Sequence, residues 1–175
     1  MNTEFRAIRP KSDEHLTYYS KYIDRVPDGD IVETLRNDTR ETLQFLRSIP
    51  EAKFDHRYAP GKWTIRQVVG HLADGERVFQ YRAWRFSRAD STSVPGFDEN
   101  LYVDNAPFES VSMPDLIDEF ENLRQASIHL FSNMTGEMMA RRGLANGAEV
   151  SVRAIAFIIA GHVSHHVEVL KERYL

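Results

Sequence analysis

The segment VRAIAFIIAG, residues 152–161, is the feature that most limits the folds open to this chain. Its apolar side chains would point in nearly every direction around a helix, so such a helix must lie at the centre of the fold. The helical pattern runs from about Ser151 to Arg173. We therefore expect other elements to pack around this helix on most of its sides.

Two further segments predict long helices with clear start signals. One begins at Asp30, which together with Glu33 matches a capping box, and it ends before Pro50. Another begins at Ser112, with Pro114 in the first turn, where the missing N–H does no harm. A shorter helical pattern precedes both of them, over residues 14–23.

The segment KWTIRQVVGHLAD predicts a helix whose start is especially well specified. Thr64 and Gln67 form a second capping-box pattern. Trp63 and Val68 occupy the two positions of a hydrophobic staple, a role we expect for Trp63 in preference to a substrate contact. Apolar residues continue at helical spacing as far as Phe86.

Four long helices in a chain of 175 residues predict an all-α four-helix bundle, formed by residues 1–175 as a single domain. Strand signals are weak, although Asn146-Gly147 could form a tight turn or a short hairpin. Residues 89–111 would be a long loop between the second and third helices. A structureless connection of this length is usually either functional or disordered.

Composition excludes several classes of function. The chain has no cysteine, which excludes disulfides, thiolate metal sites and a cysteine nucleophile. Its net charge is −4 and no Lys/Arg run stands out, so a nucleic-acid partner is not expected. The polar start MNTEFRAIRPKSDEH and the absence of an 18-residue apolar run predict a cytoplasmic protein without a membrane span.

Three of the seven histidines fall within five positions, in GHVSHH. A helical wheel places His162 and His166 about 40° apart, in the middle of the inward apolar stripe, and His165 on its flank. An i, i+4 pair presents two imidazoles on one face, where they could bind a single Zn, Ni or Fe ion. The alternative is that these histidines are hydrogen-bonded members of the core.

A catalytic metal site usually has three protein ligands and an open position, so a third ligand is needed. His71 lies near the inward stripe of the helix that begins after Thr64, and Gly70 and Gly75 flank it. Glycine within a helix costs up to about 1 kcal/mol, so we expect close helix approach or room for a ligand there. The other histidines that could supply the third ligand are His15, His56 and His129.

PGKWTIRQVVGHLAD, followed much later by GHVSHHVEVL, resembles the DinB-like superfamily of metalloenzymes, and in particular its YfiT and bacillithiol-transferase branch. The resemblance extends from about Tyr22 to Arg173. It implies a bundle with up-down-down-up connectivity and one divalent metal ion, Zn, Ni or Fe, held by His71, His162 and His166. It also implies a homodimer, since homodimers are common in that family.

A three-histidine site with open positions supports two kinds of chemistry on a small-molecule substrate. Activation of water gives a hydrolase, and binding of a thiolate gives a transferase. The resemblance implies bacillithiol, mycothiol or glutathione as the low-molecular-weight thiol cosubstrate. The alternative function is that of a non-catalytic stress-response bundle that binds metal or ligand.

Acidic side chains near the predicted ligands are candidates for proton transfer. Asp74 lies one turn past His71 and, like Glu76, could orient the imidazole. Glu99, in the loop segment PGFDEN with Asp98, could serve as an acid or base. We take Asp74 and Glu99 as the catalytic candidates, against the alternatives of a solvated acid and an ordinary polar loop. Arg153 is a further candidate, as an anion contact.

Overall fold

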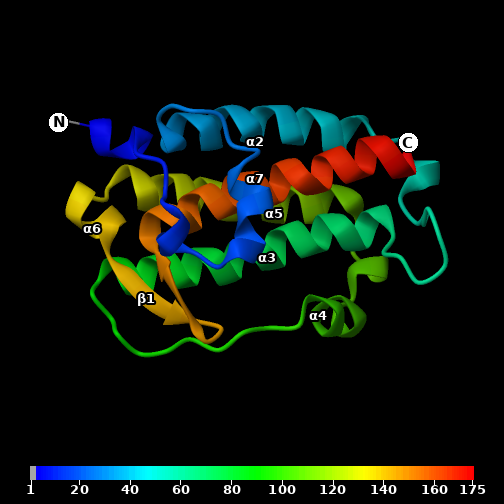
Figure 1. Cartoon of the computed structure of the whole chain (residues 1–175). Helices are drawn as coiled ribbons and strands as arrows, with labels where there is room; N and C mark the ends of the chain where they lie inside the picture. The colour runs from blue at the N-terminus through cyan, green and yellow to red at the C-terminus, as the bar shows by residue number, and fades with distance from the viewer. Residues whose placement is uncertain (1–2) are drawn as a thin grey trace.

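The structure is a computed structural model that describes residues 3–175, and four long helices form a bundle (Figure 1). The bundle helices are α2 (Ile31–Ser48), α3 (Ile65–Ser87), α5 (Met113–Ser132) and α7 (Val152–Val169), which continues as a π-helical turn over Leu170–Tyr174. Smaller elements are α1 (Ser20–Ile23), α4 (Glu99–Asn105), α6 (Gly136–Ala140) and the strands β1 (Arg142–Ala145) and β2 (Ala148–Ser151). The predicted all-α bundle is confirmed, with one small hairpin added.

Helices α2 and α7 run in one direction along the bundle, and α3 and α5 run in the other (Figure 1). Helix α3 packs against α5 and α7, and α2 packs against the same two helices. This is the predicted up-down-down-up connectivity. Because α3 and α5 run in parallel, residues 88–112 must travel back along the outside of the bundle between them (Figure 1).

The helix starts follow the predicted capping residues. Thr64 and Gln67 form a reciprocal capping box at α3, with Thr64 Oγ1 accepting from the Gln67 N–H at 3.1 Å. Asp30 caps α2, but Glu33 contributes only its N–H to Asp30, and its carboxylate lies 3.5 Å from Arg36. The caps of α5 and α7 are Ser112 and Ser151.

The apolar half of α7 lies at the centre of the bundle, as its composition predicts. All of its residues from Ala154 to Val163 are buried, and they join two clusters of core side chains on either side. Gly161 allows the closest approach, because a Cβ there would collide with the backbone carbonyl of Tyr22 in α1. Helix α1 therefore packs directly on the part of α7 that carries His162.

The predicted short N-terminal helix is present, but it is shorter than the pattern over residues 14–23. Two 3-10 turns, Ser12–Glu14 and Thr17–Tyr19, precede the single helical turn of α1, and His15 between them is extended. The cause is the carboxylate of Glu14, which accepts hydrogen bonds from Ser151 at 2.7 Å and from Arg153 at 3.0 Å. These bonds hold the segment against the start of α7, where a straight helix could not follow.

The crossover between α3 and α5 is ordered and has structure of its own. It contains α4, capped by the Asp98 side chain, and a 3-10 turn over Phe108–Ser110. Val94 forms a bridge to Ala145 at the end of β1. Asn146 and Gly147 have φ angles of 52° and 75°, so the β1–β2 hairpin closes with the tight turn that the sequence predicts.

In the described part of the chain, residues 3–175, no helix combines the length and the apolar character that a membrane crossing requires.

Candidate metal centre

Three histidines from two helices meet in the middle of the bundle. His71 comes from α3, and His162 and His166 come from successive turns of α7. The Nε2 atoms of His71 and His162 are 3.0 Å apart, and one nitrogen from each ring lies within 4.8 Å of the others. The spacing that favoured the His162/His166 pair thus places both rings beside His71.

The donor set fits a divalent transition metal. Two nitrogens that bind one ion at about 2.0–2.1 Å stand about 2.9–3.4 Å apart, so the His71–His162 separation suits chelation. Within residues 3–175, no other group of His, Asp or Glu side chains comes together in this way. The histidines that the sequence left as alternative third ligands, His15, His56 and His129, lie outside the cluster.

Burial keeps the three imidazoles in the neutral form that binds metals. It lowers the pKa of His71 to about 4. Burial also lowers the pKa of His162 and His166 well below the usual value, and the neighbouring histidines add to the effect. A neutral imidazole has a free lone pair at pH 7, so the site is ready to bind a metal without first losing protons.

The two helical glycines of α3 make room for specific rings. A Cβ on Gly75 would lie 2.9 Å from His162 Cε1, so the α3 backbone is the wall against which this imidazole rests. A Cβ on Gly70 would overlap the ring of Phe108, a buried residue of the crossover. Both glycines therefore allow the close approach that their position within a helix predicts.

Aromatic rings enclose the three histidines. Tyr22 and Phe79 present ring edges to His162, at centroid distances of 5.5 and 6.0 Å. Trp63 packs on His71 at 4.7 Å, so its ring supports a proposed ligand in addition to its staple position beside Val68. His165, on the flank of α7 as predicted, faces Tyr22, and its buried Nδ1 has no hydrogen-bond partner among residues 3–175.

A buried ion pair lies within electrostatic range of His162. Glu76 and Arg124 form a bidentate pair, with N–O distances of 3.0 and 2.9 Å, and both side chains are almost completely inaccessible to solvent. Arg124 also donates to the carbonyl of Ile159, and its charge contributes to lowering the pKa of His162. Glu76 thus pairs with Arg124 of α5. It makes no hydrogen bond to His71, the contact that the sequence suggested.

The two acids predicted as catalytic take different positions. Asp74 is half-buried and lies 3.6 Å from Arg77, on the side of α3 that faces α5. Glu99 is the exposed first residue of α4, and its charge adds to the effect of burial in raising the pKa of Tyr22. Glu99 therefore lies within electrostatic range of a ring that contacts His162. Catalytic roles for Asp74 and Glu99 stay predictions.

Two other polar candidates have structural partners. Asp98 accepts hydrogen bonds from the Asn100 and Leu101 N–H groups as the N-cap of α4. Arg153 pairs with Glu14 at 3.0 Å, so its guanidinium binds a carboxylate of the chain itself. Roles for Asp98 as an acid or base and for Arg153 as a contact to an external anion stay predictions.

A pocket of about 420 Å³ opens beside His166. Its volume lies in the range of small-molecule sites, about 300–1,000 Å³. The walls come from the loop before α3, from α4 and from the end of α7. Sequence reasoning missed the pocket itself, because the quoted segments that line it are far apart in the chain and meet only in the fold, and Tyr58, Arg173 and Tyr174 belong to none of them. The lining residues used below are Tyr58, Lys62, Trp63, Asn100, Arg173 and Tyr174.

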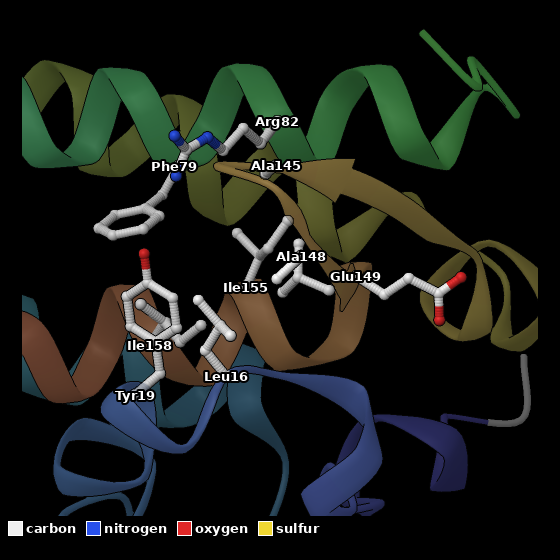
Figure 2. A pocket seen from close by; sticks show the side chains of 10 residues that line it. Leu16, Tyr19, Phe79, Arg82, Ala145, Ala148, Glu149, Ile155 and Ile158 are labelled. Carbon is white, nitrogen blue, oxygen red and sulfur yellow. The ribbon is translucent and has the colours of Figure 1, made fainter. Parts of the chain in front are cut away.

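Figure 2 shows a second cavity, enclosed between the hairpin, α3 and α7. Tyr19 directs its hydroxyl toward Phe79, and Arg82 lies beyond that ring (Figure 2). The cavity measures about 10 Å³, which is room for at most one water molecule. It therefore cannot hold a substrate, and the pocket beside His166 is the candidate binding site.

Comparison with known proteins finds relatives named for metal-dependent hydrolysis. The chain is 27% identical over 142 residues to OB0413 of Oceanobacillus iheyensis, a candidate metal-dependent hydrolase, covering 80% of this chain and 79% of the relative. It is 24% identical over 143 residues to a candidate metal-dependent hydrolase of Geobacillus thermodenitrificans, covering 74% and 80%.

Solved structures share the fold. YfiT from Bacillus subtilis, described as a metal-dependent hydrolase candidate with an unusual four-helix bundle topology, superposes with a TM-score of 0.75 at 17% identity, over 94% of this chain and 90% of YfiT. The mycothiol-dependent maleylpyruvate isomerase superposes with a TM-score of 0.68 at 13% identity, over 83% and 61%. The DinB superfamily model matches residues 34–170, so the chain belongs to the DinB superfamily.

Proposed function

We propose that this chain is a metal-dependent hydrolase of a small molecule, with one divalent Zn, Ni or Fe ion held by His71, His162 and His166. The observation that carries the proposal is the buried cluster of three neutral imidazoles beside an open pocket. The relatives from Oceanobacillus and Geobacillus support the hydrolase class. A bound ion of this kind activates water and polarises a carbonyl.

The side chains of this protein would prepare the site in three ways. Trp63 fixes the orientation of His71, because its ring packs on that imidazole, and Gly75 fixes His162 in the same way through the α3 backbone. His166 is less buried than the other two ligands and borders the pocket, so substrate would approach from its side. Glu99, at the start of α4, would accept a proton during the reaction. Asp74, in α3, would be the second acid or base.

A second candidate is transfer of a low-molecular-weight thiol, of the bacillithiol, mycothiol or glutathione type. The fold match to a mycothiol-dependent isomerase favours it. Because the chain has no cysteine, the thiol would have to enter the pocket as a cosubstrate. A third candidate is a non-catalytic bundle that binds a metal or ligand in the stress response.

The test combines metal analysis with a comparison of two reactions. Protein purified without an affinity tag should contain about one divalent ion per chain, as expected for a three-ligand site. The loaded protein is then assayed on ester and amide substrates, with and without added thiol. Hydrolysis without thiol supports the first candidate, and turnover only with thiol supports the second. Bound metal without any turnover supports the non-catalytic bundle, and metal-free protein refutes the site.

Homodimer formation, a cytoplasmic location and a single folding domain are also part of the proposal. Equilibrium sedimentation measures homodimer formation, and a single cooperative unfolding transition would support a single folding domain.

A further inference from the structure

The pocket beside His166 contains two cationic side chains and no carboxylate. Lys62 and Arg173 belong to its lining, together with aromatic, aliphatic and amide side chains. We propose that this pocket binds small molecules that carry a carboxylate or phosphate group on an apolar body, with Lys62 and Arg173 holding the anionic group. The inference names a substrate class for the site, and to that extent it rests on the proposed function.

The charge of these two residues is not neutralised within the described chain. Neither Lys62 nor Arg173 forms an ion pair with any of residues 3–175. Other arginines of the same region do form ion pairs: Arg57 lies 3.3 Å from Glu109, and Arg66 lies 3.0 Å from Asp55. In a chain with a net charge of −4, a pocket lined by two free cations is a local exception. Clefts lined by one sign of charge attract ligands of the opposite sign.

The two cations come from two segments that are tied together. Lys62 directly precedes Trp63, whose ring packs on His71. Arg173 follows His166 by two helical turns, and its guanidinium lies 5.5 Å from the centre of the Tyr58 ring. Tyr174, the next residue, donates a hydrogen bond of 2.8 Å to the carbonyl of Trp63. This bond fixes the end of the last helix to the loop before α3, so the fold holds the two segments together.

The distance from the cations to the histidines limits the length of the ligand. Arg173 lies seven positions after His166, which is at most about 10 Å along the helix axis, since the last of these positions belong to the π-helical turn. An anionic group at Arg173 therefore places the other end of a ligand of about that length beside His166. The indole of Trp63 and the phenol rings of Tyr58 and Tyr174 give the space between them an apolar wall. A planar guanidinium pairs well with carboxylate and phosphate, which makes Arg173 the principal contact.

The test measures binding of three matched probes by calorimetry at low salt. The probes are 4-phenylbutyrate, 3-phenylpropyl phosphate and the neutral 4-phenylbutan-1-ol. At least one acid should bind at least about five-fold more tightly than the alcohol, as expected for paired charges at a partly exposed site. The preference should shrink as ionic strength rises. The two acids show whether carboxylate or phosphate fits better.

Variants assign the preference to the two residues. The double variant K62Q/R173Q should bind acids and alcohol alike. R40Q, which removes one exposed charge from α2 and does not alter the lining of the pocket, should keep the wild-type preference. Lys62 and Arg173 are exposed, so their replacement should leave the unfolding temperature unchanged.

Metal-free protein separates this inference from the proposed function. An acid could also bind the ion itself, so the preference must persist after the metal has been removed. A preference that disappears with the metal, or that survives in K62Q/R173Q, overturns the inference, and so does failure of both acids to bind at millimolar concentration. If the protein neither binds metal nor hydrolyses esters but keeps the preference, the proposed function is wrong and the inference stands.

Discussion

His71 Nε2 lies 3.0 Å from His162 Nε2, although 91 residues separate the two histidines in the sequence. Both rings are buried, and burial depresses the pKa of each. Two neutral imidazole nitrogens at this distance either share one proton or face a common ion. The choice between these two states leads to the first prediction.

Replacement of His162 or His166 by alanine should abolish metal binding. A site reduced to two ligands holds a divalent ion much more weakly, so the metal content should fall from about one ion per chain to nearly none. Elemental analysis of tag-free protein measures the metal content per chain. His165→Ala is the matched control on the same helix and should keep the ion. Equal loss in all three variants would show that the effect is on folding.

Gly75→Ala should weaken metal binding without unfolding the protein. The new Cβ would lie 2.9 Å from His162 Cε1 and would push the imidazole off its position. We expect a loss of metal affinity of about ten-fold or more, comparable with the effect of disturbing groups that orient metal ligands. Competition with a chelating dye measures this affinity. Gly70→Ala, which meets Phe108 instead, should reduce stability more than affinity, and the reverse order would contradict the assignment.

The stability of the metal-free protein should fall as the pH is lowered from about 6.5 to 4. In the unfolded chain His71 takes up a proton near pH 6.5, but in the folded chain its pKa is about 4. The unfolded state therefore binds more protons in this window, and acid favours unfolding. Urea titrations at pH 7 and pH 4 should differ by up to about 3 kcal/mol more in the wild type than in His71→Asn. An identical pH dependence would mean that His71 titrates normally.

Arg124→Met should strongly destabilise the fold. It leaves the carboxylate of Glu76 buried without a partner, which typically costs about 3–5 kcal/mol. The double variant E76L/R124M removes both charges and should recover much of the loss. The midpoint of urea unfolding measures both effects. If the double variant is no more stable than the single one, the packing of Arg124 matters more than its charge.

The parts that the sequence predicted are those with local signals. The capping box of Thr64 and Gln67 marks the start of α3, and the i, i+4 spacing of His162 and His166 places both rings on one face of α7. The turn at Asn146-Gly147 follows from the left-handed backbone that these residues tolerate. His71 could be chosen as the third histidine only through the family resemblance.

The parts that the sequence did not predict depend on long-range contacts. Glu76 and Arg124 are 48 residues apart, and no local pattern links them. Lys62 and Arg173 come to one pocket although they are 111 positions apart in the sequence. The helical pattern at 14–23 overestimated the length of the short N-terminal helix, because it does not show that Glu14 accepts hydrogen bonds from Ser151 and Arg153 at the start of α7.

The crossover from α3 to α5 gives this fold a way to diversify. Two parallel neighbours require a connection that runs the length of the bundle, and this connection passes the pocket, where Asn100 of α4 lines it. The histidines belong to α3 and α7 and do not depend on the sequence of this connection. Phe108 of the same connection packs on Gly70 and belongs to the core, but replacements of exposed residues in α4 can reshape the pocket wall while the bundle and the imidazoles stay as they are.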